Sequence, residues 1–324
     1  MSDIKFSHIQ TNGISMRLAE AGEGPLVLLI HGWPESWYSW RHQLSALAEQ
    51  GYHAVAPDMR GYGDSSAPAD PAEYRIDKLA ADVVGIVDHF AESKATIIGH
   101  DWGSMVVWHA ALFHPDRFNG VIGMSVPYGG RAKVAPLESF KAAMGDNFFY
   151  ILYHNETGGV AEAEYDSDPR GVLSRLYASP DTPRAPAVVT DPKRAAGGWI
   201  DRLGAPLEQP DWLTEADLDY YVSEFTRSGF RGGVNYYRNF DTNWDLTADL
   251  DPVIQIPSAF ISGSADVVIA GASQEALTSM MKPVMTDLRD VTIIPDMGHW
   301  VQQEAPKQTN AAISRFLSSL ELRS

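Results

Sequence analysis

The sequence predicts an α/β protein in which a mostly parallel central sheet is flanked by helices and carries an inserted helical domain. Two patterns support this prediction. Short continuous apolar runs alternate with amphipathic stretches of helical length at both ends of the chain. Such runs are typical of strands that are buried on both faces of a parallel sheet. A long central stretch between these two regions lacks the alternation.

The N-terminal part of the expected sheet comes from residues 1–127. Its apolar runs predict strands at residues 26–30, 53–57, 95–98 and 121–126. The intervening helices are expected at residues 39–50, 76–90 and 104–113. In the second helix Leu79, Val83 and Ile86 recur on one stripe, as in an amphipathic helix that covers a sheet. Repeated strand–helix–strand units build a parallel sheet with both faces covered.

The same alternation resumes in residues 241–324. The expected elements are strands at residues 257–261 and 291–294 and a closing helix at residues 307–320. We therefore expect a core domain that is formed by residues 1–127 together with residues 241–324.

Residues 128–240 form the expected insertion, a helical cap domain. They contain aromatic-rich helical pieces that are punctuated by proline and glycine, and no buried-strand pattern. Within them, residues 166–186 are rich in turn formers, so we expect a mobile loop there.

The chain is acidic and contains no cysteine. Its 25 Lys and Arg residues against 42 Asp and Glu residues give a formal charge of −17. This charge argues against nucleic acid or an anionic membrane as a partner, because both attract basic surfaces. The lack of cysteine excludes disulfides, thiolate metal sites and a cysteine nucleophile. No apolar run approaches the ~20 residues of a membrane span, and the N-terminus lacks a signal-peptide pattern, so we expect a cytoplasmic protein.

The strongest chemical signal is the segment Gly99-His100-Asp101-Trp102-Gly103. It lies between an expected buried strand and an expected apolar helix. A nucleophile between two small residues at such a junction is the nucleophile elbow of the α/β-hydrolase fold. Here the central residue is Asp101 rather than the usual serine. The alternative is an aspartate that simply caps the following helix.

Two further residues fit a catalytic triad with Asp101. Asp266 follows the expected strand at residues 257–261, and His299 follows the expected strand at residues 291–294. The chain order of nucleophile, acid and histidine is the order of this fold's triads. Each residue also lies in a loop after a strand, where open α/β sheets bind ligands. The alternatives are an ordinary loop aspartate and a surface histidine.

A third loop completes the expected site. His31-Gly32-Trp33-Pro34 follows the first expected strand. Its Trp33 N–H and the Trp102 N–H are the expected pair of donors in an oxyanion hole. A cis Trp33-Pro34 bond would suit a tight turn here, and a simple turn without catalytic role is the alternative.

An aspartate nucleophile restricts the reaction. Attack on an ester or amide carbonyl would give an anhydride, whereas attack on saturated carbon gives a stable alkyl ester. Epoxides and alkyl halides are therefore the expected electrophiles. His299, oriented by Asp266, would then activate water to cleave the ester, and the oxyanion hole would stabilise the charge that develops.

Nearly the whole chain resembles the α/β-hydrolase-fold epoxide hydrolases, the group that includes the catalytic domain of soluble epoxide hydrolase. The matching core segments are residues 31–34, 60–66, 99–103 and 298–300, and the matching cap segments are residues 149–153, 159–164, 228–232 and 235–239. The resemblance implies that two cap tyrosines hold the epoxide oxygen, at Tyr150 and Tyr237. If the register of the cap is shifted, Tyr153 and Tyr236 take their places, and core packing is the alternative for any of them.

The expected partners are a small apolar epoxide and water, with neither nucleic acid nor membrane. The substrate-binding residues we expect are His31, Trp33, Pro34, Trp102, Phe149 and Trp300. An exposed apolar patch on the cap would support a homodimer. The sequence contains no zinc-binding His-Glu-x-x-His pattern, no phosphate loop and no dinucleotide fingerprint, so we expect neither metal nor cofactor.

Two other functions use the same residues differently. A haloalkane or haloacid dehalogenase would employ the same triad, bind halide at the Trp102 N–H and require no tyrosine pair. A fluoroacetate-type enzyme would carry arginine after the nucleophile, where this chain has Trp102. A binding protein on the hydrolase fold would be expected to have lost part of the catalytic set, which is complete here.

Overall fold

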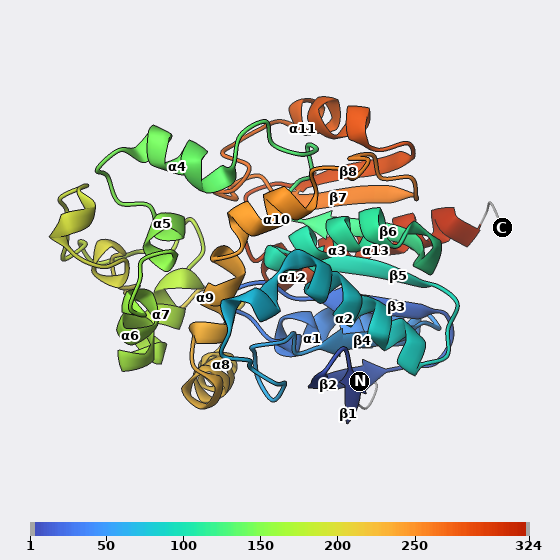
Figure 1. Cartoon of the computed structure of the whole chain (residues 1–324). Coiled ribbons are helices and arrows are strands. Elements are labelled where there is room, and N and C mark those ends of the chain that lie inside the picture. Colours follow the sequence, from blue (N-terminus) through green and yellow to red (C-terminus); the bar gives the residue numbers. More distant parts are fainter. Residues whose placement is uncertain (1–3, 322–324) are drawn as a thin grey trace.

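The structure is a computed structural model and describes residues 4–321. Its centre is an eight-stranded sheet in the order β1-β2-β4-β3-β5-β6-β7-β8 (Figure 1). The strands are β1 (Lys5–Thr11), β2 (Ile14–Ala21), β3 (Leu26–Ile30), β4 (His53–Pro57), β5 (Ala95–His100), β6 (Phe118–Met124), β7 (Ser258–Gly263) and β8 (Leu288–Ile294). β1–β2 and β2–β4 pair antiparallel, and all other pairs are parallel. The predicted α/β class with a mostly parallel sheet is confirmed.

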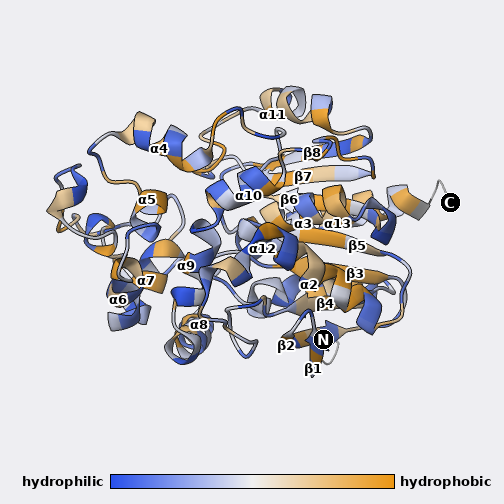
Figure 2. Ribbon diagram, viewed as in Figure 1, coloured by the Kyte–Doolittle hydropathy of each residue, from blue (hydrophilic) through white to orange (hydrophobic). Residues whose placement is uncertain are grey.

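Helices of the core cover both faces of the sheet. The core helices are α1 (Arg41–Glu49), α2 (Ile76–His89), α3 (Trp102–Phe113), α11 (Gln274–Met281), α12 (Val301–Glu304) and α13 (Pro306–Glu321). Alternate side chains of β3 are buried on opposite faces, as the period of two requires. Leu28 and Ile30 join the core beneath α2 and α3, whereas Val27 and Leu29 join the core beneath α1 and α13. The apolar colour of β3 and β5 in Figure 2 reflects this burial on both faces.

The second group of helices lies between β6 and β7 in the sequence. These helices are α4 (Pro136–Met144), α5 (Tyr150–His154), α6 (Val160–Ser167), α7 (Pro169–Leu176), α8 (Glu215–Ser228), α9 (Arg231–Tyr237) and α10 (Phe240–Leu246). In Figure 1, α5 to α8 lie beyond one end of the strands. Hydrogen bonds join them to the core, among them Tyr236 Oη to the Arg60 carbonyl at 3.0 Å and Trp300 Nε1 to the Leu176 carbonyl at 2.9 Å. The exact division into core and cap domains stays a prediction, as does a homodimer.

The structure corrects three details of the expected elements. The antiparallel hairpin β1–β2 was not predicted, because its strands alternate polar and apolar residues and β1 is largely exposed. The first helix begins as a 3₁₀ turn, Trp37–Trp40, before α1. The prediction of a loop throughout residues 166–186 was wrong, since α7 occupies Pro169–Leu176. Asp168 caps α7 by accepting from the Gly171 N–H, and Pro169 fits the first turn.

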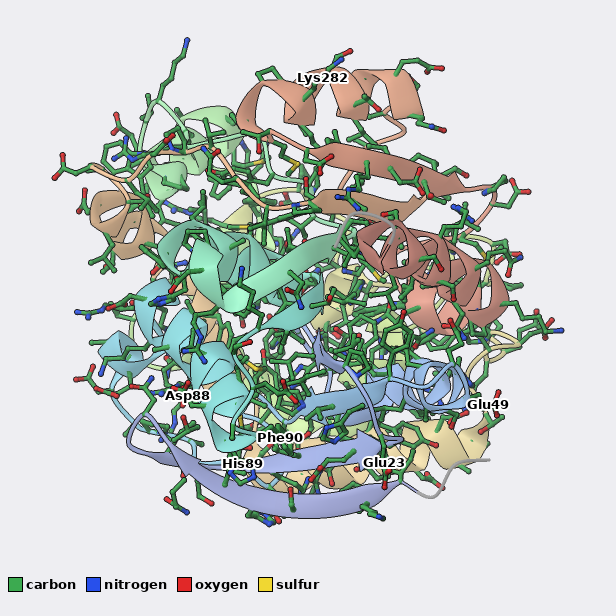
Figure 3. The ribbon with its side chains drawn as sticks, turned by 90° about the vertical axis from the view of Figure 1, so that its right-hand side faces the viewer. Glu23, Glu49, Asp88, His89, Phe90 and Lys282 are labelled. Carbon is green, nitrogen blue, oxygen red and sulfur yellow. The ribbon has the colours of Figure 1, made fainter. Side chains whose placement is uncertain are left out.

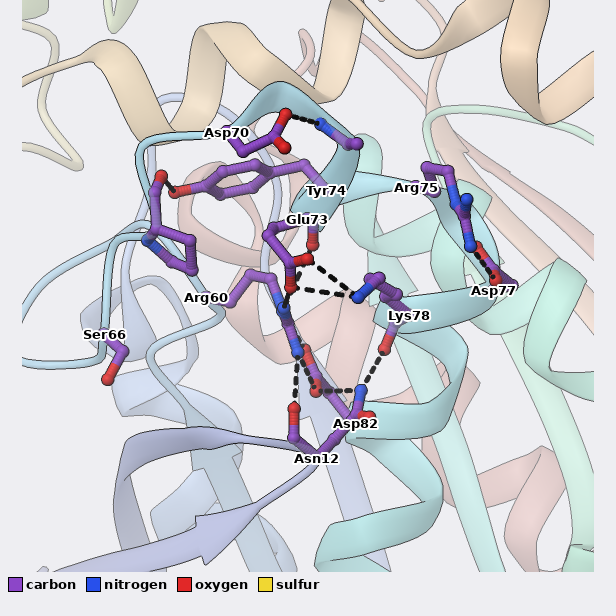
Figure 4. Close-up of polar contacts among 12 residues, drawn as sticks. Asn12, Arg60, Ser66, Asp70, Glu73, Tyr74, Arg75, Asp77, Lys78 and Asp82 are labelled. Carbon is purple, nitrogen blue, oxygen red and sulfur yellow. Dashed lines mark hydrogen bonds and ion pairs between the residues drawn. The ribbon is translucent and has the colours of Figure 1, made fainter.

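A buried ion pair joins the N-terminal hairpin to the helical layer (Figure 4). Arg60 Nε and Nη2 donate to the two carboxylate oxygens of Asp82 on α2, each at 2.7 Å. Both side chains are almost fully buried, with exposed fractions of 1% and 0%. Asn12, in the turn between β1 and β2, donates from Nδ2 to Asp82 at 2.9 Å. Removing Asp82 would therefore leave the buried Arg60 with only Glu73, a 37% exposed side chain whose Oε2 lies 3.3 Å from Nη1.

We expect Asp82→Ala to lower the free energy of unfolding by about 3–5 kcal/mol, because Arg60 would lose its buried partner. Urea unfolding monitored by circular dichroism measures the loss. Asp77→Ala on the same helix is the matched control, since Asp77 forms a half-exposed pair with Arg75, worth less than about 1 kcal/mol. Equal effects of the two substitutions would contradict this account.

The two ends of the strands differ in character. Figure 3 views the end opposite the insertion, where Glu23, Glu49 and Asp88 lie near the turns that lead into β3, β4 and β5. The carboxyl ends of the same strands face the insertion. In open α/β sheets the carboxyl ends carry the ligand site. Among the helices of residues 4–321, none combines the length and apolar character needed to cross a bilayer.

Candidate active site

The turn after β5 holds Asp101 in a conformation that few residues adopt. Its φ is 54° and its ψ is −117°, and the helix α3 starts at the next residue. The neighbouring glycines are required by close backbone approach. A Cβ on Gly99 would lie 2.1 Å from the Gly103 carbonyl oxygen, and one on Gly103 would lie 2.0 Å from the Ile30 carbonyl oxygen. Within the described chain, the Asp101 side chain makes no capping hydrogen bond to α3, so the capping alternative finds no support.

The loop after β3 contacts the Asp101 carboxylate directly. The Trp33 N–H donates to Asp101 Oδ1 at 2.8 Å. Gly32 permits this approach, because a Cβ there would lie 2.5 Å from the Asp101 side chain. The predicted cis bond between Trp33 and Pro34 is confirmed. Donation from the Trp102 N–H stays a prediction.

His299 lies between the two aspartates that the sequence singled out. Its Nδ1 is 3.0 Å from Asp266 Oδ1 and 3.2 Å from Asp266 Oδ2. Its Nε2 is 3.6 Å from Asp101 Oδ2, the carboxylate oxygen that Trp33 does not contact. Asp266 is itself fixed by the Val268 N–H, which donates to Oδ1 at 2.9 Å. The structure thus brings the three residues together in the order Asp101, His299, Asp266.

The charges of His299 and Asp266 shift each other's pKa. Burial lowers the pKa of His299, but the charge of Asp266, the hydrogen bond to Asp266 and the nearby Asp101 carboxylate outweigh burial, so the pKa lies well above its usual value. Burial raises the pKa of Asp266, yet the His299 charge, its hydrogen bond and the Val268 N–H lower it to about 2. Asp266 therefore stays ionised at neutral pH and holds the imidazole with its Nδ1 proton toward the carboxylate.

A buried carboxylate beneath the site was missed by the sequence reasoning. Glu35 accepts from the Gly32 N–H at 2.6 Å and contacts His100 Nδ1 at 2.8 Å. His100 Nε2 in turn lies 2.8 Å from the carbonyl oxygen of His299. Three active-site loops are thereby connected through two side chains. A signal was present, because Glu35 directly follows the segment that ends at Pro34.

The two expected cap tyrosines enter the same cavity as Asp101 and His299. Tyr150 begins α5 and Tyr237 ends α9, and their ring centroids are 5.9 Å apart. Burial, followed by the charge of Asp101, raises the pKa of both phenols. Both hydroxyls therefore stay protonated and remain available as donors.

Tyr153 and Tyr236, the alternatives for a shifted cap register, form hydrogen bonds outside the Asp101 cavity. Tyr236 is buried and donates to the Arg60 carbonyl oxygen at 3.0 Å. Tyr153 donates to the Val160 carbonyl oxygen at 3.4 Å and lines a different hollow of the insertion. Neither belongs to the wall of the Asp101 cavity, so the geometry favours the unshifted register.

The cavity has a volume of about 290 Å³ and a mainly apolar wall. Of the expected substrate-binding residues, Trp33, Pro34 and Trp300 line it, whereas His31, Phe149 and the Trp102 ring do not. His31 is buried and hydrogen-bonds the backbone at Gly32 and Met59 through its two ring nitrogens. The ring of Phe149 packs against Phe140 and against Tyr150, each with a centroid distance of 5.2 Å.

The indole of Trp102 does not line the cavity. It packs against the ring of Tyr237 with a centroid distance of 5.1 Å. The sequence reasoning also missed Trp199, which stacks on Tyr150 at 4.6 Å and on Trp33 at 5.7 Å. Trp199 belongs to a segment without periodicity, so no sequence pattern pointed to it. In residues 4–321, no group of three or more acidic or histidine side chains is arranged to hold a metal ion.

The elbow, the sheet and the acid–histidine pair define an α/β hydrolase whose nucleophile position holds aspartate. A family model described as alpha/beta hydrolase fold matches residues 25–153. Epoxide hydrolase A of Mycobacterium tuberculosis is 45% identical over 321 residues, with 97% of this chain and 98% of the relative covered. Epoxide hydrolase 3 of Siraitia grosvenorii is 38% identical, with 98% of this chain and 99% of the relative covered.

A solved structure supports the same family relationship as these sequence relatives. The crystal structure of epoxide hydrolase A from Mycobacterium thermoresistibile matches with a TM-score of 0.88 and 46% identity, covering 98% of each chain. The chain belongs to the epoxide hydrolase family of the α/β-hydrolase fold.

Proposed function

We propose that this protein hydrolyses epoxides to vicinal diols through a covalent alkyl-enzyme ester on Asp101. One observation carries the proposal. A carboxylate held by a backbone N–H shares a cavity with a histidine base and two phenols. An acyl-transfer hydrolase would need a serine or cysteine at the elbow and no phenol pair. The family relationship supports the same reaction class.

In the first half-reaction Asp101 Oδ2 attacks an epoxide carbon, and the carbon–oxygen bond of the ring breaks. Oδ2 is the candidate because Oδ1 is already bound to the Trp33 N–H. The leaving oxygen becomes an alkoxide, which Tyr150 and Tyr237 stabilise by hydrogen bonds until one phenol gives up its proton. The product is a hydroxyalkyl ester of Asp101.

In the second half-reaction His299 takes a proton from water, and the hydroxide attacks Cγ of the ester. Oδ1 then carries the developing negative charge and is stabilised by the Trp33 N–H, with the Trp102 N–H as the proposed second donor. Collapse of the tetrahedral intermediate breaks the Cγ–Oδ2 bond, and His299 returns its proton to the diol. The remaining water proton restores the tyrosine.

Tyr150→Phe and Tyr237→Phe should each slow alkylation, and the double substitution should lower its rate by roughly 10²–10⁴-fold, because the alkoxide would form without a proton donor. Rapid-quench measurement of the alkyl-enzyme gives the rate. Tyr153→Phe is the matched control, since its hydroxyl lies outside the cavity. An unchanged alkylation rate in the double variant would refute the assignment.

Lower pH should slow ester hydrolysis before it slows alkylation. His299 must be neutral to accept a proton, and Asp101 no longer carries a charge once it is esterified. The loss of that charge removes one cause of the raised His299 pKa, so the pKa falls in the intermediate. The steady-state fraction of alkyl-enzyme should therefore rise as pH falls from about 9 to about 5. A fraction that stays constant across this interval would argue against His299 as the base.

The proposed activity is tested by product formation from racemic styrene oxide, with 1,2-dibromoethane assayed in parallel for bromide release. Diol formation that disappears in Asp101→Ala supports the proposal. Bromide release without diol would indicate a dehalogenase and would leave Tyr150 and Tyr237 as packing residues. That outcome would overturn the proposed function while leaving the nucleophile in place.

A further inference from the structure

One carboxylate holds the backbone on both sides of His299. Glu304, the last residue of α12, accepts from the Gly298 N–H through Oε2 at 2.7 Å. Its other oxygen, Oε1, accepts from the Trp300 N–H at 2.8 Å. Hydrogen bonds from an N–H to an ionised carboxylate are about twice as strong as those between neutral groups. The residues before and after His299 are therefore both anchored to the same side chain.

The peptide bond between His299 and Trp300 is fixed at its carbonyl as well as at its N–H. The His299 carbonyl oxygen accepts from Ser125 Oγ at 2.9 Å, and His100 Nε2 lies 2.8 Å from it. Glu304 holds the N–H at the opposite edge of the same peptide. The direction in which the imidazole leaves the backbone follows from the orientation of this peptide, so the position of Nε2 depends on these contacts.

Capping of α12 does not account for both contacts of Glu304. This helix begins at Val301, with Trp300 as its N-cap. An acidic side chain that reaches back to the N-cap N–H is a common way to stabilise the start of a helix. Gly298, however, lies two residues before the N-cap and outside the helix. The contact with Gly298 therefore fixes the chain that leads into His299.

The backbone at Gly298 is closely packed on several sides. A Cβ there would lie 3.0 Å from Glu304 Oε1 and 2.7 Å from Cδ of Pro180 in the insertion. A Cβ on Gly263, at the end of β7, would lie 2.3 Å from the Gly298 carbonyl oxygen. Gly298 and Trp300 are both buried, so without Glu304 their N–H groups would lose their acceptors away from water.

The contacts of Glu304 fit an ionised carboxylate. Burial raises its pKa, whereas the two N–H donors and the charge of His299 act in the opposite direction. Both of its oxygens accept a hydrogen bond, as in the acceptor-only form of the side chain. Within residues 4–321 no lysine or arginine forms an ion pair with Glu304, so the carboxylate serves the backbone around His299.

We propose that Glu304 is a positioning residue for the second half-reaction, which holds the His299 imidazole where it can activate water at the Asp101 ester. The inference rests on the proposed epoxide hydrolysis. Alkylation uses the Asp101 carboxylate and the two cap phenols. Ester hydrolysis also requires Nε2 within reach of a water that is aimed at Cγ, and a displacement of about 1 Å in such an arrangement can cost about 10²-fold in rate. Glu304 therefore acts on one step of the two.

The test compares Glu304→Gln with the wild type in single turnovers of styrene oxide, with enzyme in excess and rapid quenching. Glutamine has a similar shape, but its amide nitrogen would face one of the two N–H donors and repel it. The rate constant for ester hydrolysis should fall about 10- to 100-fold, whereas that for alkylation should stay unchanged. The alkyl-enzyme should therefore accumulate in the variant.

Glu49→Gln is the matched control, because Glu49 is the exposed last residue of α1, as Glu304 is the last residue of α12. Both of its rate constants should equal those of the wild type. A merely structural role of Glu304 would lower the amplitude of the turnover, which counts folded sites, and leave both rate constants unchanged. That result, or an equal fall of both rate constants, would overturn the inference.

A measurement on the wild-type chain covers the case in which Glu304→Gln does not fold. Amide hydrogen exchange followed by NMR should show that the Gly298 and Trp300 N–H groups exchange far more slowly than in an unstructured peptide of the same sequence. Exchange at the peptide's rate would overturn the inference and leave the epoxide hydrolase proposal intact. If the wild type formed neither alkyl-enzyme nor diol, the proposed function itself would fail.

Discussion

Asp101→Ala should abolish turnover of epoxides, with kcat lowered by roughly 10⁴-fold or more, because no other group can form the covalent ester. The position of His299 prevents it from replacing the Asp101 carboxylate as the nucleophile. His299 Nε2 points at Asp101 and Nδ1 is bound to Asp266, so the histidine cannot replace the nucleophile while it remains oriented as a base. Diol formation from styrene oxide, followed by chromatography, measures the loss.

Two controls separate chemistry from folding in this experiment. Asp116→Ala removes an exposed aspartate and should leave kcat unchanged. Asp101→Asn keeps the shape of the side chain at the strained elbow while removing its charge, and should be equally inactive. Diol formation near the wild-type rate in a folded Asp101→Ala protein would eliminate Asp101 as the nucleophile.

His299→Gln should still be alkylated but should hardly release diol, with hydrolysis of the ester slowed by roughly 10³-fold or more. Glutamine fills similar space but cannot accept the proton of the attacking water. Intact-protein mass spectrometry under excess epoxide should therefore show a gain equal to one substrate molecule. Peptide mapping should locate the adduct at Asp101.

The matched control for this substitution is His89→Gln, an exposed histidine at the end of the chain's second helix. It should turn over normally and accumulate no adduct. An unmodified mass in His299→Gln, together with lost turnover, would mean that His299 is needed for the first step. The two-step assignment would then be wrong.

The parallel strands of the sheet were predictable from the sequence because they are short apolar runs. Residues 26–30 and 54–57 are continuous apolar runs, and the structure has strands at Leu26–Ile30 and His53–Pro57. The hairpin β1–β2 has no such run, because an edge strand that is half exposed needs few apolar residues. The nearness of Asp101, Asp266 and His299 was also predictable, since each follows a parallel strand and these strands end at the same edge of the sheet.

The wall of the cavity was less predictable. Trp199 and Arg184 lie in irregular segments of the insertion, where no period links sequence to orientation. Their positions depend on long-range packing, for example of Trp199 on Tyr150. His31 and Phe149 do not line the cavity, for the related reason that proximity in sequence to Trp33 or Tyr150 does not fix the direction of a side chain.

A single turnover in ¹⁸O-labelled water, with enzyme in excess over epoxide, tests the covalent role of Asp101 most directly. In the proposed mechanism the first diol takes its new oxygen from Asp101 Oδ2, and the water oxygen enters the carboxylate. The covalent mechanism therefore predicts unlabelled diol and one ¹⁸O in the peptide that contains Asp101. Labelled diol with an unlabelled peptide would mean that water attacks the epoxide directly, and would contradict the account.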